Sequence, residues 1–204
     1  MTYYDISRDA VILCWFIFAV VFLAKRQPAG ATEIKRNPGA KIGMILEGIA
    51  YVLVWSRRRT SPELFPSGSN ILEVVLCTAA VLIAVCSLWI TISAVKTLGK
   101  QWALEARVIQ DHQLITRGPY RIVRNPIYTG MLGLLISTGL VMSTWYIILL
   151  AIVVFMVGTA IRVHSEEKVL REHFGEIFEE YRRRVPAYIP NFRTQHSGHA
   201  NEAH

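Results

Sequence analysis

Residues 127–161 read IYTGMLGLLISTGLVMSTWYIILLAIVVFMVGTAI, an apolar run of 35 residues without a charged side chain. As a single α-helix the run would be about 52 Å long at 1.5 Å per residue, far longer than the ~30 Å hydrocarbon core of a bilayer. The small polar residues Ser143 and Thr144 follow Met142 near its middle. We therefore predict a helical hairpin that crosses a membrane twice and turns at residues 142–144.

Three further apolar segments precede this hairpin, at residues 10–24, 42–56 and 71–95. The chain is 52% hydrophobic and 18% charged, with a mean hydropathy of +0.35, which is typical of a membrane protein. The predicted fold class is all-α, a polytopic membrane helical bundle with about five transmembrane helices. The second span is the weakest of the five because it is short and carries Glu47. Small residues along the fourth span, Gly130, Gly133, Ser137 and Gly139, favour close helix packing.

The net charge of +7 raises the question of a nucleic-acid partner. The basic residues lie between the apolar segments, where lipid head groups and membrane topology account for them, and there is no groove-reading motif, so we expect no nucleic-acid binding. With five spans, 18 of the 22 lysines and arginines fall on one side and 4 on the other. This asymmetry predicts an outside N-terminus and a cytoplasmic C-terminus. The triplet Arg57–Arg59 is the exception on the outer side.

The three cysteines, Cys14, Cys77 and Cys86, all lie in apolar segments and form no CxxC pair. We interpret them as small buried apolar residues and expect no metal site. The histidines of the last residues, 191–204, have no regular spacing, and this stretch is typical of a disordered end.

A polar segment, RGPYRIVRNPIYTG at residues 117–130, leads into the hairpin. Gly118-Pro119 and Asn125-Pro126 are turn signals, and Pro126 suits the first turn of a helix with Asn125 as its N-cap. One interpretation is a basic and aromatic collar at the membrane interface. However, the loop that contains this segment has about 33 residues, and loops of that length in small domains are usually functional.

A charged segment, IRVHSEEKVLREHFGEIFEEYRRRVPAYIP at residues 161–190, follows the hairpin. Arg162 and Glu166 are four residues apart and share one face of a helix, which on its own indicates only an exposed ion pair worth a few tenths of a kcal/mol. Both polar segments fall on the same predicted side of the membrane, at the ends of the last two spans. We therefore predict a pocket at the membrane edge lined by Tyr120, Arg124, Asn125, Tyr128, Arg162 and Glu166.

At these residues the chain resembles the isoprenylcysteine carboxyl methyltransferase family of integral-membrane enzymes. The family pattern R-H-P-x-Y-x-G appears as Arg124 to Gly130, and R-x-x-x-E as Arg162 to Glu166. Gly118 and Tyr120 precede these residues, and Phe174-Gly175, Tyr181 and Val185 to Pro190 follow them. The match covers residues 98–190, nearly half the chain.

The resemblance implies S-adenosylmethionine as methyl donor and S-adenosylhomocysteine as product, bound at the cytoplasmic face by the third loop and the tail. The residues that would contact the donor are Arg107, His112, Gln113, Leu114, Ile115, Tyr120, Asn125, Pro126, Ile127, Tyr128 and Glu166. Arg162 falls where the family places an arginine against the substrate. Arg162, Glu166 and Asn125 are the candidate catalytic residues, and no metal is implied.

Asn125 departs from the family, which usually has histidine there. Asparagine can form hydrogen bonds but cannot take up a proton at neutral pH. We favour a role in orientation, because a carboxylate or thiolate acceptor arrives already deprotonated.

The methyl acceptor implied by the resemblance is the carboxylate of a prenylated cysteine or a similar lipid acid, entering between helices from the membrane lipids. A thiol or an amine fits one arginine and apolar walls equally well. Two other functions remain open, a membrane reductase using NADPH and a non-catalytic membrane subunit with a degenerate pocket. We expect one integral-membrane domain over residues 1–204, with N-terminal spans at 1–97, a catalytic core at 98–190 and a disordered tail at 191–204. The oligomeric state stays open.

Overall fold

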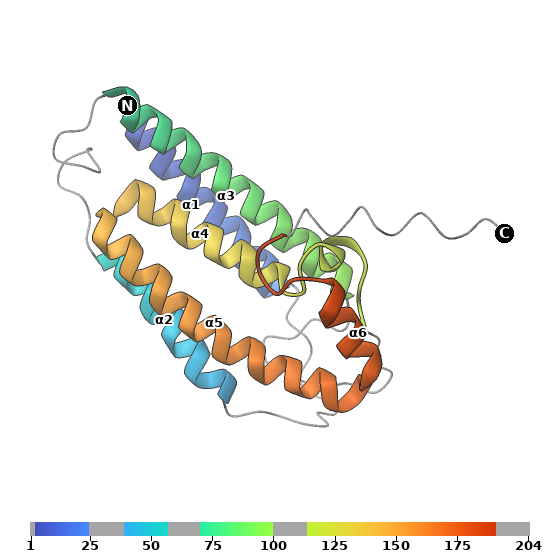
Figure 1. Ribbon diagram of the computed structural model, residues 1–204. Helices are drawn as coiled ribbons and strands as arrows, with labels where there is room; N and C mark the ends of the chain where they lie inside the picture. Colours follow the sequence, from blue (N-terminus) through green and yellow to red (C-terminus); the bar gives the residue numbers. More distant parts are fainter. Residues whose placement is uncertain (1–2, 25–38, 57–69, 100–113, 191–204) are drawn as a thin grey trace.

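The computed structural model describes residues 3–24, 39–56, 70–99 and 114–190, which contain helices and turns but no β-strand (Figure 1). The predicted all-α fold class is confirmed. The segments expected at 10–24, 42–56 and 71–95 each lie within a longer helix. In chain order the elements are α1 (Tyr3–Ala24), α2 (Gly39–Ser56), α3 (Asn70–Leu98), the 3₁₀ helix η2 (Gly118–Arg121), α4 (Pro126–Met142), α5 (Trp145–Phe174) and α6 (Glu176–Arg184).

The predicted hairpin turn is confirmed. Helix α4 ends at Met142, and the Ser143 amide donates to the Gly139 carbonyl at 2.8 Å. Helix α5 begins at Trp145, where the Ile148 amide donates to the Thr144 carbonyl at 3.1 Å. The two helices run antiparallel and return the chain to the end of the bundle at which it entered (Figure 1).

Helix α5 continues well beyond its apolar part. Its 30 residues correspond to about 45 Å, which exceeds the ~30 Å hydrocarbon core. The last 13 residues of the helix carry the charged sequence that begins at Arg162. It ends at Phe174, and the following residue, Gly175, turns the chain into α6 with a positive φ of 54°.

Helices α1, α3 and α5 are long and apolar enough to cross a membrane, and α4 is a shorter apolar helix. Large apolar side chains such as Phe16, Leu23 and Trp89 are exposed on the outer faces of α1 and α3, as lipid contact requires. The other predicted span, α2, is helical over 18 residues at the expected position. The number of five spans stays a prediction.

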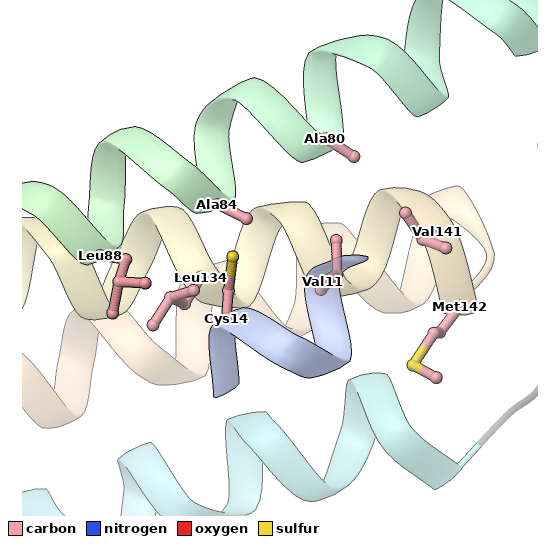
Figure 2. Close-up of a cluster of buried hydrophobic side chains, with 8 residues drawn as sticks. All are labelled: Val11, Cys14, Ala80, Ala84, Leu88, Leu134, Val141 and Met142. Atoms are coloured by element: carbon pink, nitrogen blue, oxygen red, sulfur yellow. The ribbon is translucent and has the colours of Figure 1, made fainter. Parts of the chain in front are cut away.

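The bundle has two parts joined through α4 and α5 (Figure 1). In one part, α1, α3 and α4 meet around an apolar cluster (Figure 2). In the other part, α2 packs along α5. The apolar cluster consists of Val11, Cys14, Ala80, Ala84, Leu88, Leu134, Val141 and Met142.

The prediction that all three cysteines are buried is wrong for Cys86. Cys14 and Cys77 are buried, whereas Cys86 is exposed on α3. The outer face of a membrane helix is as apolar as its inner face, so hydrophobicity alone does not separate lipid contact from core.

Helix α4 packs closely against α3 at small residues that were predicted to favour such packing. A side chain at Gly130 would collide with the Thr91 hydroxyl and come within 2.8 Å of the Ser87 carbonyl. A side chain at Gly133 would collide with the Ser87 hydroxyl. These glycines let the two backbones approach closely.

A second crossing of glycines joins α2 to α5. A Cβ atom added to Gly158 would lie 2.7 Å from the Gly43 carbonyl and 3.1 Å from the Glu47 amide nitrogen. One added to Gly43 would lie 2.5 Å from the Gly158 carbonyl. Backbone thus meets backbone at this crossing, one helical turn from Glu47 on α2 and from Arg162 on α5.

Candidate functional site

The polar segment before α4 folds as two tight turns. Gly118 opens η2 with a φ of +61°, and a Cβ atom there would lie 2.9 Å from the Thr97 hydroxyl, so both conformation and space require glycine. Pro126 starts α4 with Asn125 at the N-cap position, as predicted. The expected capping hydrogen bond is absent, because the Asn125 side chain instead donates from Nδ2 to the Ala187 carbonyl at 3.2 Å.

Residues 185–190, which we call the C-terminal strap, lie across the start of α4. The Arg124 and Asn125 amides donate to the Pro186 and Ala187 carbonyls at 2.8 and 3.1 Å. The Thr129 hydroxyl donates to the Tyr188 carbonyl at 2.9 Å. The loop before α4 and the tail after α5 are therefore joined directly, as predicted from their shared side of the membrane.

Arg124 holds the strap through its side chain. Its guanidinium pairs with Glu167 of α5 at 2.9 Å and donates to the Arg182 carbonyl at 3.0 Å and to the Val185 carbonyl. Arg124 was expected to line the pocket. In the structure its side chain joins the segment before α4 to α5 and to the C-terminal strap.

We predict that Arg124→Gln loosens the strap. The variant loses the ion pair and at least one charge-assisted hydrogen bond, each worth about 1.5–3 kcal/mol when buried. In hydrogen–deuterium exchange, the amides of residues 124 and 125 should therefore exchange about 10-fold faster or more. The exposed neighbour Arg121 offers a matched control, since Arg121→Gln should leave these two amides as protected as in the wild type.

Tyr181 of α6 adds a further attachment. Its hydroxyl donates to the Tyr120 carbonyl of η2 at 2.6 Å. Burial raises the pKa of Tyr181 above its ordinary value, so the phenol keeps its proton and remains a donor. Burial likewise raises the pKa of Tyr120.

A polar cluster lies beneath this closure, at the junction of α2, α4 and α5. Tyr128 of α4 donates its hydroxyl proton to Glu166 Oε1 of α5 at 2.5 Å. The Arg162 guanidinium lies over the Tyr128 ring, 5.0 Å from its centroid, and its NH2 group is 3.8 Å from Glu166 Oε1. The predicted meeting of the two motifs on either side of the hairpin is thus present in the structure.

Glu47 of α2 completes the polar cluster and was not among the predicted site residues. It is 2% exposed, and its Oε2 accepts from Arg162 NH1 at 2.8 Å. Its Oε1 accepts from the Thr159 hydroxyl at 3.0 Å. The sequence did carry a signal, because a carboxylate inside an apolar membrane segment is by default a candidate functional residue.

Most of the predicted site residues within the described ranges gather at one end of the bundle. Tyr128, Arg162 and Glu166 are in the polar cluster. Tyr120 lies in η2, Asn125 at the N-cap of α4, and Pro126 and Ile127 in the first turn of α4. Leu114 and Ile115 are half-buried just before η2. Arg107, His112 and Gln113 lie outside the described residues, as do Arg57–Arg59 and the tail 191–204.

The polar cluster has a formal charge of −1, from two carboxylates and one guanidinium. It therefore suits a ligand with a cationic group and hydrogen-bond donors. In the described part of the chain no three His, Cys, Asp or Glu side chains are grouped as metal ligands would be.

Comparison with known proteins identifies relatives of this region. A family model described as phospholipid methyltransferase matches residues 75–177. "Protein-S-isoprenylcysteine O-methyltransferase" of Schizosaccharomyces pombe is 35% identical over 81 residues, covering 40% of this chain and 34% of that protein. "Protein-S-isoprenylcysteine O-methyltransferase B" of Arabidopsis thaliana is 31% identical over 100 residues, covering 48% and 51%.

A third relative has a different kind of name. "Cobalt-zinc-cadmium resistance protein CzcN" of Cupriavidus metallidurans is 33% identical over 96 residues, covering 46% of this chain and 44% of that protein. The chain thus spans a third to a half of the length of these curated relatives.

Proposed function

This chain belongs to the phospholipid methyltransferase family, and from that premise we propose that it transfers a methyl group from S-adenosylmethionine to a lipophilic acceptor. The resemblance to isoprenylcysteine methyltransferases, inferred from Arg124 to Gly130 and Arg162 to Glu166, is confirmed at the level of the family. The acceptor that we propose is the carboxylate of a prenylated cysteine or a similar lipid acid.

The observation that carries this proposal is the 2.5 Å hydrogen bond between Tyr128 and Glu166. It brings together the two segments that flank the hairpin and carry the family pattern, a contact that membrane anchoring alone does not require. The polar cluster also fits the donor chemically. Its net negative charge suits a sulfonium, and the Glu166 carboxylate is an acceptor for the donor's amine or hydroxyl groups.

When bound, S-adenosylmethionine supplies a methyl group on positively charged sulfur. We propose that Glu166 and Tyr128 hold the donor and that Arg162 orients the acceptor, with the C-terminal strap limiting access of water. Methyl transfer to an anion neutralises two opposite charges, so a site with little water favours the transition state over the separated ions. Alignment of acceptor and methyl group provides the remaining rate gain.

The charge around Arg162 also bears on the acceptor. Arg162 already pairs with Glu47 and lies 3.8 Å from Glu166, so an acidic acceptor would approach a guanidinium flanked by two carboxylates. A test of the proposed acceptor must therefore include thiols and amines besides acids.

The direct test is methyl transfer by the purified protein in detergent or nanodiscs. Radiolabelled S-adenosylmethionine is offered with N-acetyl-S-farnesylcysteine, a long-chain fatty acid, a lipophilic thiol and phosphatidylethanolamine. We expect labelled product with at least one acceptor, and with the farnesylcysteine above all. Binding of NADPH in place of S-adenosylmethionine would indicate the reductase, and binding of neither by folded protein would indicate the non-catalytic subunit.

We propose an integral-membrane location with an outside N-terminus and a cytoplasmic site. The apolar helices α1, α3 and α5 support the location, and the excess of basic residues on one side supports the orientation. The catalytic core predicted at residues 98–190 needs to be extended in this proposal. Because Glu47 belongs to the polar cluster, we include α2 in the catalytic unit.

A further inference from the structure

Arg162 stands between two carboxylates at unequal distances. Its NH1 group is 2.8 Å from Glu47 Oε2, whereas its NH2 group is 3.8 Å from Glu166 Oε1. The shorter pair is a charge-assisted hydrogen bond, and the longer one is beyond hydrogen-bond distance. Glu166 instead accepts its short hydrogen bond from Tyr128.

Glu47 is held rigidly in this arrangement. Both its oxygens have partners on one turn of α5, the Thr159 hydroxyl and the Arg162 guanidinium. The crossing of Gly43 and Gly158 brings the α2 and α5 backbones into contact one turn away, and a Cβ at Gly158 would already lie 3.1 Å from the Glu47 nitrogen. Moving the Glu47 carboxylate away from Arg162 would therefore break its hydrogen bonds to both α5 partners.

We propose that Glu47 is a positioning residue that draws Arg162 away from Glu166 and so keeps Glu166 available for the donor. The inference rests on the proposed function, in which Glu166 binds the donor. Without Glu47, the buried guanidinium still has the Glu166 carboxylate 3.8 Å away. An uncompensated buried charge is strongly unfavourable, so the Arg162 guanidinium would move closer to Glu166 and hydrogen-bond to it directly. Glu166 would then be occupied from within the protein.

The test measures binding of S-adenosylhomocysteine by calorimetry in detergent, not turnover. This ligand lacks the sulfonium and carries no net charge, so loss of the Glu47 charge affects it less than it would affect S-adenosylmethionine. We expect Glu47→Gln to weaken its binding about 10-fold or more. We expect the double variant Glu47→Gln with Arg162→Gln to bind at least about 5-fold more tightly than Glu47→Gln alone, because the guanidinium that blocks Glu166 has been removed.

A purely structural role for Glu47 is distinguished by the melting temperatures of the two variants. An unpaired buried charge destabilises the fold and removal of both partners relieves it, so a structural role predicts that affinity changes only where the melting temperature changes with it. The proposal predicts that the affinity of folded protein changes at temperatures well below melting, and a double variant that binds no better than Glu47→Gln overturns it. Equal binding by Glu47→Gln and the wild type also overturns it. Gly48→Ala, at an exposed α2 position with open space around it, is the matched control and should bind as the wild type does.

A second pair of variants and the wild type itself provide two further comparisons. If Glu47→Gln alone does not fold, the double variant is compared with Arg162→Gln. Glu47 has no guanidinium to position in that background, so the two affinities should agree within about 3-fold, and a larger loss would contradict the proposal. Failure of the wild type to bind S-adenosylhomocysteine would refute the proposed function itself, which is a distinct outcome.

Discussion

Gly158→Leu is expected to abolish the folded protein or to lower its melting temperature by about 10 °C or more. Even a single Cβ atom at this position would lie 2.7 Å from the Gly43 carbonyl and 2.9 Å from the Leu46 Cβ atom. The clash is with backbone atoms of α2, which cannot change rotamer as a flexible side chain can. Helix α2 must therefore move away from α5. Overpacking typically lowers the free energy of unfolding by about 1–3 kcal/mol, and here the loss should reach the upper end of that range or exceed it. Each kcal/mol lost lowers the melting temperature of a protein of this size by about 2–4 °C.

The displacement should also break the Glu47–Arg162 ion pair, which depends on the same contact between helices. Thermal unfolding followed by circular dichroism in detergent measures the effect. Gly48→Leu adds the same side chain to α2 at an exposed position with nothing within 4 Å, so it should melt close to the wild type. Similar melting temperatures for the two variants would show that the close crossing of α2 and α5 is absent from the protein in solution.

The second large effect is expected from Glu166→Gln, which should weaken binding of S-adenosylmethionine about 10- to 100-fold. The substitution keeps the shape of the side chain but removes the negative charge of the carboxylate. That carboxylate accepts a hydrogen bond from the Tyr128 hydroxyl and, in our proposal, from the methyl donor. Hydrogen bonds to charged groups contribute about 1.5–3 kcal/mol, and each 1.4 kcal/mol corresponds to a factor of ten in affinity.

Calorimetric titration of the purified variant measures this loss. Glu172→Gln removes a carboxylate from an exposed position of the same helix and should retain the wild-type affinity. If Glu166→Gln binds the donor as tightly as Glu172→Gln does, Glu166 is not part of the donor site. The Tyr128–Glu166 hydrogen bond would then be a structural contact only.

The position of the hairpin could be predicted from sequence because it follows from length. No single helix of the 35 apolar residues fits a bilayer, and Ser143-Thr144 offered a polar break at the middle of the run. The meeting of Tyr128 and Glu166 was predictable for a related reason. A hairpin returns the chain to its starting side, so motifs just before and just after it must lie near one another.

The ion pair between Glu47 and Arg162 could not be predicted in the same way. It joins residues 115 positions apart on helices that are not consecutive, and it depends on how α2 is rotated against α5. Glu47 was interpreted only as a weakness of the second span. Glycines at 43 and 158 set the rotation, but sequence alone did not show that they face each other.

The function of Asn125 was also misjudged at one point. Its place at the start of α4 suggested a capping side chain, yet the side chain binds the Ala187 carbonyl of the strap. The C-terminal strap has no regular secondary structure, so its sequence has no hydrophobic periodicity from which its contact with the start of α4 could be predicted. The role of Asn125 toward the donor stays a prediction.

The distance along the chain between Glu47 and Arg162 has a consequence for how the protein is made. At 5–20 residues per second, a ribosome adds the 115 residues between them in about 6–23 s. During that interval α2, the span predicted at 42–56, carries a carboxylate whose guanidinium has not yet been translated. We therefore expect stable insertion of this span to await the emergence of α5, so that biogenesis of the N-terminal half depends on the C-terminal half.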